Sequence, residues 1–241
     1  MEKICYEIEA KEYALIPGSP IAYWVSPNMI GIFSRSRTLD NFADCCTGMQ
    51  TGNNDKYVRN WFEISISDFD TSATVATSKW VKYNCGGESR KWYGNHNKVV
   101  FWQNDGQAIK SEKGAVIRNS SFFFKEGISW KRIGSTDFFL RYLPQGFIFD
   151  QAGDSMFIRE PDNLFYVLAF VNTKVALEAF KFIAPTLNLT AGSLNKLPIL
   201  DDREQGVSSE IDVLVTKNIQ AERQDWDAFE TSWDFKKHPL I

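Results

Sequence analysis

Residues 79–104 read KWVKYNCGGESRKWYGNHNKVVFWQN, with aromatic side chains alternating with cationic and polar ones. This alternation, interrupted by Gly86-Gly87 and Gly94, predicts a β-hairpin with a turn-rich connection. Cations beside aromatic rings also suit a surface that meets phosphate groups and bases together. The alternative is a hairpin whose aromatic side chains are core and whose lysines are merely solvated, and the stretch alone leaves both interpretations open.

Charge is distributed unevenly along the chain. The formal net charge is −3, yet residues 79–142 contain twelve Lys and Arg against five Asp and Glu. Residues 199–241 contain five basic and ten acidic side chains. A field of one sign attracts a polyanion, whereas an acidic remainder limits nonspecific binding. We therefore expect one basic face on an otherwise acidic molecule, suited to a polyanion.

Length and composition indicate a folded globular protein. The chain has 241 residues, of which 44% are hydrophobic and 15% aromatic, enough for one large domain or a domain with an appendage. No signal peptide and no apolar run of about 18 residues is evident, which argues against a membrane or secreted protein. The four cysteines form no C-x-x-C motif and only two histidines accompany them, so we expect no metal site and a reducing, cytoplasmic location.

The pattern of short apolar runs predicts an α+β fold with a β-rich body. Strand-like runs occur at 61–66, 122–124, 128–130, 138–140 and 147–149, and a first strand or short helix is compatible with 1–16. Two helices are expected at 164–171 and 174–183, the second capped by Asn172-Thr173 and ending before Pro185. They form a supporting helical segment near 162–183. We divide the chain into residues 1–199 and an acidic C-terminal segment, 200–241, which would pack on a neighbouring or missing domain.

Catalytic motifs are missing from the sequence. It contains no G-x-S-x-G, no P-loop and no G-x-G-x-x-G, and two histidines far apart do not supply a hydrolytic metal centre. We therefore expect no catalytic residues in this chain and no catalysis by the chain alone.

Five stretches of the sequence carry a resemblance to a known family. They are TGMQTGNNDKYVRNWFE, KWVKYNCGGESRKWYGNHNKVVFWQNDG, GISWKRIGSTDFFLRYLPQGFIFD, LFYVLAFVNTKVALEAFKFIAPTLNLTAGSLNKLPI and DWDAFETSWDFKKHPL. Together they resemble the C-terminal half of PglX-type adenine-specific DNA methyltransferases of bacterial BREX phage-defence systems, and related fused restriction-modification enzymes. The G-S-L-N-K-L-P-I sequence at 192–199 is also similar to target recognition domains of type I specificity subunits. The resemblance covers nearly the whole chain in colinear order.

This resemblance implies a target recognition domain, which reads a short DNA sequence so that a neighbouring catalytic domain can methylate an adenine at N6. In the family, an N-terminal methyltransferase domain holds S-adenosylmethionine and carries an Asn-Pro-Pro-Tyr motif for the flipped base. No Asn-Pro-Pro occurs in this chain. We therefore expect no cofactor here. The expected partners are double-stranded DNA, the methyltransferase domain of the same parent chain and other phage-defence components.

The expected DNA contacts lie in the loop at 50–59 and in the basic region that begins at residue 79. Lys and Arg would hold phosphates, whereas Asn, Gln and Arg would read base edges in the major groove. The candidates are Gln50, Thr51, Asn53, Asn54, Lys56, Arg59, Lys79, Lys82, Arg90, Lys91, Trp92, Tyr93, Lys98, Lys131, Arg132 and Arg141.

Two other classes of function fit parts of this pattern. An aromatic-rich carbohydrate-binding module would also be β-rich, with exposed tryptophans and little positive charge at its site. A protein-interaction domain of a defence complex would use the same aromatics and the acidic tail, and would show a dry apolar patch in place of a basic cleft.

Overall fold

The predicted hairpin at the centre of the sequence is present in the computed structural model, which describes residues 25–134, 138–185, 188–200 and 207–241. Strands β4 (Trp80–Asn84) and β5 (Lys98–Phe101) pair antiparallel, with Trp80 opposite Phe101. Residues 85–97 form the connection between them. The segment 1–16, for which a strand or short helix is expected, lies outside the described residues.

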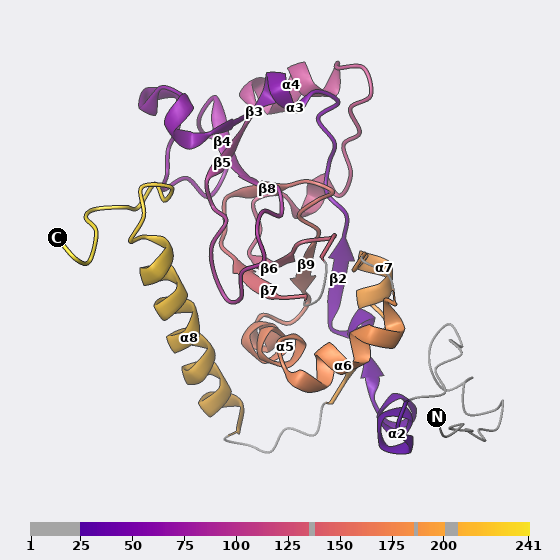
Figure 1. Cartoon of the computed structure of the whole chain (residues 1–241). Coiled ribbons are helices and arrows are strands. Elements are labelled where there is room, and N and C mark those ends of the chain that lie inside the picture. The colour runs from indigo at the N-terminus through magenta and orange to yellow at the C-terminus, as the bar shows by residue number, and fades with distance from the viewer. Residues whose placement is uncertain (1–24, 135–137, 186–187, 201–206) are drawn as a thin grey trace, which may run out of the picture.

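Two four-stranded sheets form the β-rich body, with helices at both ends (Figure 1). The first has the order β3-β5-β4-β8, in which β8 (Phe147–Phe149) runs parallel to β4 and β3 (Val58–Asn60) lies at the edge. The second has the order β2-β9-β6-β7 and is antiparallel throughout. Its strands are β2 (Ala43–Cys46), β9 (Ser155–Ile158), β6 (Gly127–Trp130) and β7 (Leu140–Leu143).

The two predicted helices are confirmed as α5 (Leu164–Val171) and α6 (Lys174–Ile183). Thr173 caps α6, because its side chain accepts a hydrogen bond from the backbone N–H of Ala176 at 3.2 Å. The other α-helices of the described residues are α2 (Pro27–Arg35), α3 (Asn54–Tyr57), α4 (Gln103–Lys110), α7 (Ala191–Leu194) and α8 (Val207–Trp226). Two short strands, β1 (Arg37–Thr38) and β10 (Pro198–Ile199), pair antiparallel with each other.

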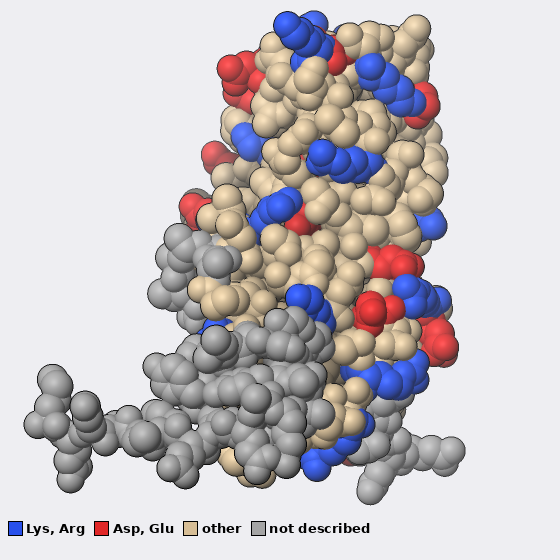
Figure 2. Space-filling model, turned by 90° about the vertical axis from the view of Figure 1, so that its right-hand side faces the viewer, with Lys and Arg blue, Asp and Glu red and all other residues tan. Residues whose placement is uncertain are grey.

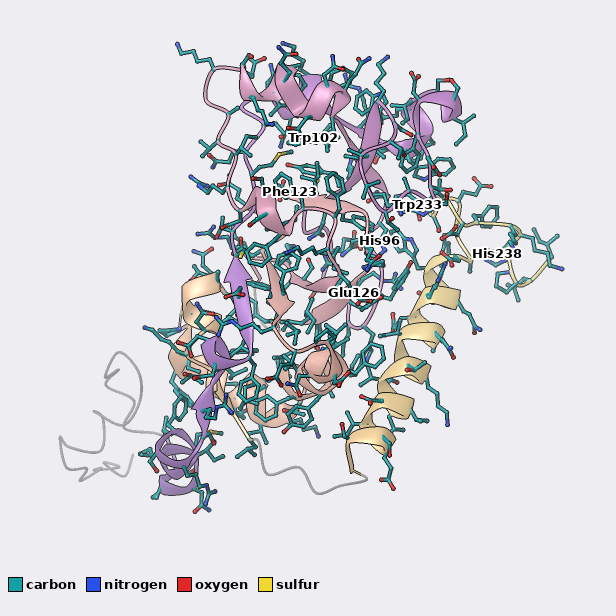
Figure 3. All side chains as sticks on the ribbon, turned by 180° about the vertical axis from the view of Figure 1, so that it is seen from behind. His96, Trp102, Phe123, Glu126, Trp233 and His238 are labelled. Carbon is teal, nitrogen blue, oxygen red and sulfur yellow. The ribbon has the colours of Figure 1, made fainter. Side chains whose placement is uncertain are left out.

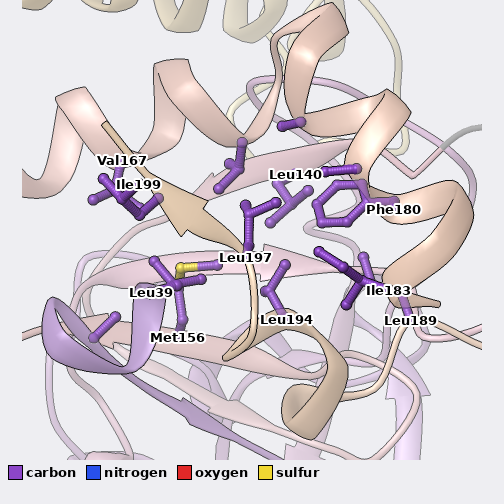
Figure 4. Packing of buried hydrophobic residues seen from close by; sticks show 14 of the residues in the cluster. Leu39, Leu140, Met156, Val167, Phe180, Ile183, Leu189, Leu194, Leu197 and Ile199 are labelled. Atoms are coloured by element: carbon purple, nitrogen blue, oxygen red, sulfur yellow. The ribbon is translucent and has the colours of Figure 1, made fainter. Parts of the chain in front are cut away.

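Each sheet has its own hydrophobic core. Apolar side chains of β6, β7 and β9 pack against α5, α6 and the α7 region, as Figure 4 shows for Leu140, Met156 and Phe180. The other core lies on the β3-β5-β4-β8 sheet and includes Tyr83, Trp102 and Phe149. Nearly all of these side chains are withdrawn from water, which is the dominant stabilising term in both halves.

Helix α8 and the residues after it fold back along the body. The helix packs on α5, and Val215 is fully buried in the first core. Beyond the helix, Trp233 stacks on His96, with ring centroids 6.4 Å apart (Figure 3). The indole N–H of Trp61 donates to the backbone oxygen of Thr231 at 3.0 Å. The aromatics of the acidic segment therefore lie against residues of this same chain, and the proposed division at residue 199 stays a prediction.

Some local expectations differ from the structure. The strand expected at 61–66 does not form. Strand β3 ends at Asn60, and a reciprocal capping box between Asn60 and Glu63 begins a 3-10 helix at residues 61–63. The strand expected at 122–124 does not form either, because residues 120–122 form a 3-10 helix and residues 123–124 a turn. Near the start of α4, Asn104, Asp105 and Gly106 all adopt positive φ, which these residue types tolerate.

Candidate nucleic-acid interface

The two sheets meet where several strands end. The loop between β8 and β9, Asp150–Asp154, touches the ends of β4 and β6: the N–H of Asp150 donates to the oxygen of Asn84 at 3.0 Å, and the N–H of Trp130 donates to the oxygen of Asp154 at 3.1 Å. Strand β2 ends beside the start of β9, with Cys46 opposite Ser155. We call residues 84–87, 129–132 and 150–155 the strand-end junction. It brings together polar residues from three parts of the chain.

A buried polar network fixes this junction. The side-chain amide of Asn84 donates to the hydroxyl of Ser129 at 2.7 Å and to the backbone oxygen of Gly153 at 3.0 Å. The guanidinium of Arg141 donates to the side-chain oxygen of Asn84 at 3.2 Å and to the backbone oxygen of Gly86. Asn84, Ser129 and Arg141 are almost completely inaccessible to water. The Nε and Nη1 atoms of Arg141 have no hydrogen-bond partner among the described residues, whereas its Nη2 and the Asn84 amide are bonded as above. These buried bonds favour a single arrangement, so the network positions the loops above it.

Close backbone approach adds to this rigidity. Gly86 and Gly87 have φ of +79° and +83°, a conformation that favours glycine. A Cβ added at Gly86 would lie 2.5 Å from the backbone oxygen of Ala152. The connection after β4 therefore depends on glycine to lie against the Asp150–Asp154 loop.

Three hollows adjoin one another around the junction. The first, of about 560 Å³, is lined by residues 49–55 together with Tyr83, Gly114, Asp150 and Gln151. The second, of about 470 Å³, shares Gln151 with the first and includes Lys131 and Arg132. The third, of about 440 Å³, shares Cys85 and Gly87 with the second and includes Arg90 and Lys98. Eight of the predicted contact residues thus line one connected surface: Gln50, Thr51, Asn53, Asn54, Arg90, Lys98, Lys131 and Arg132.

In the first hollow, part of the hydrogen-bonding capacity of the predicted loop is used by the loop itself. The Asn53 side chain caps α3 by accepting from the N–H of Lys56 at 3.1 Å. The buried hydroxyl of Thr51 donates to the side-chain oxygen of Asn54 at 2.5 Å. These bonds occupy the amide oxygens. The side-chain NH₂ groups of Asn53 and Asn54 are the groups of this loop that can donate hydrogen bonds to an acceptor atom of a ligand.

The sequence-based analysis missed Gln151, which lines two of the hollows. Its side chain is exposed and accepts a hydrogen bond from the side-chain amide of Gln50. The backbone of Gln50 is held by reciprocal hydrogen bonds with Val116, both of 2.9 Å. No periodic signal marks a single glutamine in a short loop, so only the fold could bring Gln151 to the predicted loop.

Two carboxyl groups beneath the junction have altered acidity. Burial raises the pKa of Asp150 to about 6, although backbone N–H groups of Gly153 and Ala152 donate to it and oppose the rise. Burial also raises the pKa of Asp154 to about 6, opposed by the charge of Arg132. Both carboxylates carry a desolvation cost when ionised, which a nearby cation reduces.

Ion pairs among the described residues reduce the positive charge of the basic face expected from the sequence. Arg90 is neutralised by α8, with its guanidinium 3.3 Å from Glu222 and 2.5 Å from Asp225. Lys56 pairs with Glu112 at 2.8 Å, and Lys79 with Asp68 at 3.4 Å. The Nζ of Lys91 donates to the backbone oxygen of Asn172, which puts it beside the helices. Long-range folding of acidic segments onto the basic region offsets the local charge excess.

Other predicted contacts are removed from the surface or lie elsewhere. Arg141, Tyr93 and Lys82 are buried, so direct contact of Arg141 with DNA is not supported by this conformation. Trp92 is half-buried, and Arg59 donates to backbone oxygens of Asp55 and Val58. On the face shown in Figure 2, Lys and Arg are spaced along the molecule among uncharged residues rather than gathered in one patch. Lys131 and Arg132 are the cations best placed beside the polar loops.

Among the described residues, no cluster of three or more His, Cys, Asp and Glu could hold a metal ion, and no helix is long and apolar enough to cross a membrane. The tryptophans in these parts of the chain are all buried or half-buried. Exposed tryptophans expected of a carbohydrate-binding module are thus missing from the described ranges.

Comparison with known proteins relates the chain to adenine-specific methyltransferases. It is 38% identical over 233 residues to the adenine-specific methyltransferase BrxX of Escherichia coli O9:H4 (strain HS), a match that covers 95% of this chain and 18% of that protein. It is 36% identical over 248 residues to the adenine-specific methyltransferase PglX of Lacticaseibacillus casei (strain Zhang), covering 98% of this chain and 20% of that protein. The chain thus spans about a fifth of the length of these curated relatives. No family profile matches it.

Proposed function

We propose that this chain is the DNA target recognition part of an adenine-N6 methyltransferase of a BREX or restriction-modification type phage-defence system. The observation that supports the proposal most strongly is the match of almost the whole chain to one fifth of two adenine-specific methyltransferases. The chain lacks the Asn-Pro-Pro-Tyr motif for a flipped adenine. A DNA methyltransferase must also recognise its target sequence, and we assign that role to this non-catalytic part of the enzyme.

The strand-end junction supplies the physical basis of the proposal. Amide side chains of Gln50, Asn53, Asn54 and Gln151 lie on one connected surface with Lys131 and Arg132. Amides recognise base edges in the major groove, and cations hold the flanking phosphates. Loops fixed by a buried network keep these groups in place, as a site that discriminates between base pairs requires.

The remaining parts of the proposal concern what lies outside this chain. S-adenosylmethionine would bind a separate methyltransferase domain of the parent protein, which would also be the first partner of this chain, with other defence components as further partners. The cytoplasm is the compartment where such a complex would meet DNA. The chain alone would transfer no methyl group.

Removing the two cations of the second hollow should weaken DNA binding and flatten its salt dependence. The logarithm of the association constant falls linearly with the logarithm of the salt concentration, and each lost phosphate contact reduces the magnitude of that slope by about one. The double variant Lys131→Gln with Arg132→Gln should therefore reduce it by about two. The affinity at 0.1 M salt should fall roughly tenfold or more. Fluorescence anisotropy with a labelled duplex pool, titrated between low and moderate salt, measures both quantities.

The matched control removes two exposed cations from α6, Lys174→Gln with Lys181→Gln, and should leave the slope unchanged. An unchanged slope for the Lys131 and Arg132 variant would contradict the placement of DNA on this surface. Failure of the unmodified chain to bind any duplex at low salt would contradict the proposed function as a whole.

A further inference from the structure

We infer that Gln151, held by Gln50, is a specificity-determining side chain that selects an adenine in the recognised sequence, an inference that rests on the proposed function. The two side chains come from distant parts of the chain, after β2 and after β8, and meet through an amide-to-amide hydrogen bond. Gln151 lines both the first and the second hollow, and its side chain is exposed. An exposed amide shared by two hollows is well placed to contact a base edge.

Backbone contacts fix both ends of the pair. Besides its two bonds to Val116, Gln50 follows Met49, whose backbone oxygen accepts from the N–H of Gln151 at 3.2 Å. Met49 and Asp150, which precede the two glutamines, form an isolated parallel bridge. A side chain that discriminates between bases must be held in position before the DNA arrives, because freezing it on binding would reduce its selectivity.

The hydrogen-bonding pattern of the pair matches adenine. When one amide donates to the other, the pair keeps a carbonyl oxygen on one residue and an NH₂ group on the other. Adenine presents N7 as an acceptor and the N6 amino group as a donor in the major groove, whereas guanine presents two acceptors. Exchanging the roles of the two glutamines preserves this combination of one donor and one acceptor, so the preference does not depend on which amide donates.

The hollow beside the pair has an unused polar group. The Tyr83 hydroxyl is buried, lines the first hollow and has no hydrogen-bond partner among the described residues. A buried hydroxyl without a partner is costly, so a polar atom that enters this hollow would gain a hydrogen bond. This observation is independent of the glutamine pair and favours a polar occupant at the same place.

Selection from a duplex library with a randomised core tests the inference. The unmodified chain should enrich a motif with an adenine at one position, preferred roughly tenfold or more. In Gln151→Ala that preference should fall below about twofold while other positions keep theirs, and Gln151→Glu should shift it toward cytosine, whose amino group donates to a carboxylate. Gln50→Leu should affect the same position, and the double variant should be no worse than either single one.

Gln145→Glu is the matched control, since it adds the same charge at an exposed glutamine of the β7–β8 turn. It should leave every position of the motif unchanged. An unaltered preference in Gln151→Ala, in a protein that still selects a motif, would overturn this inference and leave the proposed function standing. Absence of any enriched motif with the unmodified chain would overturn both.

Discussion

Replacing Asn84 by alanine is expected to lower the free energy of unfolding by about 3 to 4 kcal/mol. The change removes the amide that donates to Ser129 and Gly153, and it takes one acceptor from the buried guanidinium of Arg141. Polar groups left without partners in a water-free interior cost their full desolvation free energy. Urea denaturation followed by tryptophan fluorescence measures the loss.

Ser129→Ala is the matched control for this prediction. It removes a single acceptor of the Asn84 amide and leaves the bonds to Gly153 and Arg141 in place, so it should cost only about 1 kcal/mol. Equal losses in the two variants would show that Asn84 does not join the loops as described. We also expect Asn84→Ala to reduce the motif selectivity of the junction more than Ser129→Ala does, because the Asp150–Asp154 loop depends on the same amide.

Replacing Asp154 by asparagine is expected to stabilise the protein at neutral pH by about 2 to 3 kcal/mol, and to have little effect near pH 4. Burial raises the pKa of Asp154 to about 6, from a usual value of 3.8. A carboxyl with a raised pKa in the folded state destabilises that state when it ionises. The destabilisation is absent below pH 3.8, grows between pH 3.8 and 6, and is complete above pH 6.

Denaturation of the variant and the unmodified chain at pH 4 and pH 7.5 checks this prediction. Glu88→Gln, which removes an exposed carboxylate, controls for the change in net charge and should change stability little at either pH. A stabilisation by Asp154→Asn that is equal at both pH values, or a loss of stability at pH 7.5, would be inconsistent with the raised pKa.

Local patterns predicted the elements well where side chains repeat with a clear period. The hairpin around residues 80–101 and the helices α5 and α6 follow from alternation, from the Thr173 cap and from the proline at 185. Helix α8 was not predicted, although Ile211, Val215 and Ile219 recur every four residues and would have revealed its buried face. Most of the other side chains of this helix are polar or charged, so its apolar stripe is narrow.

The site was predicted less completely because it depends on long-range contacts. The loop at 50–54 and the pair Lys131 and Arg132 could be found from residue type, yet their association through Gln151 required the junction of two sheets. Arg90 illustrates the opposite error: its neutralising partners, Glu222 and Asp225, lie more than 130 residues away in the sequence. Net charge within a stretch does not predict the potential at the surface when a distant segment folds over it.

Helix α8 couples the two halves of the molecule. Val215 is buried in the core beneath the β2-β9-β6-β7 sheet, while Trp233, a few residues beyond the helix, contacts Phe147 of the other sheet at 6.0 Å between ring centroids. Opening either half would therefore release contacts that belong to both. We therefore expect the two cores to unfold together, and a disturbance of the C-terminal segment to reach the loops that lie between them.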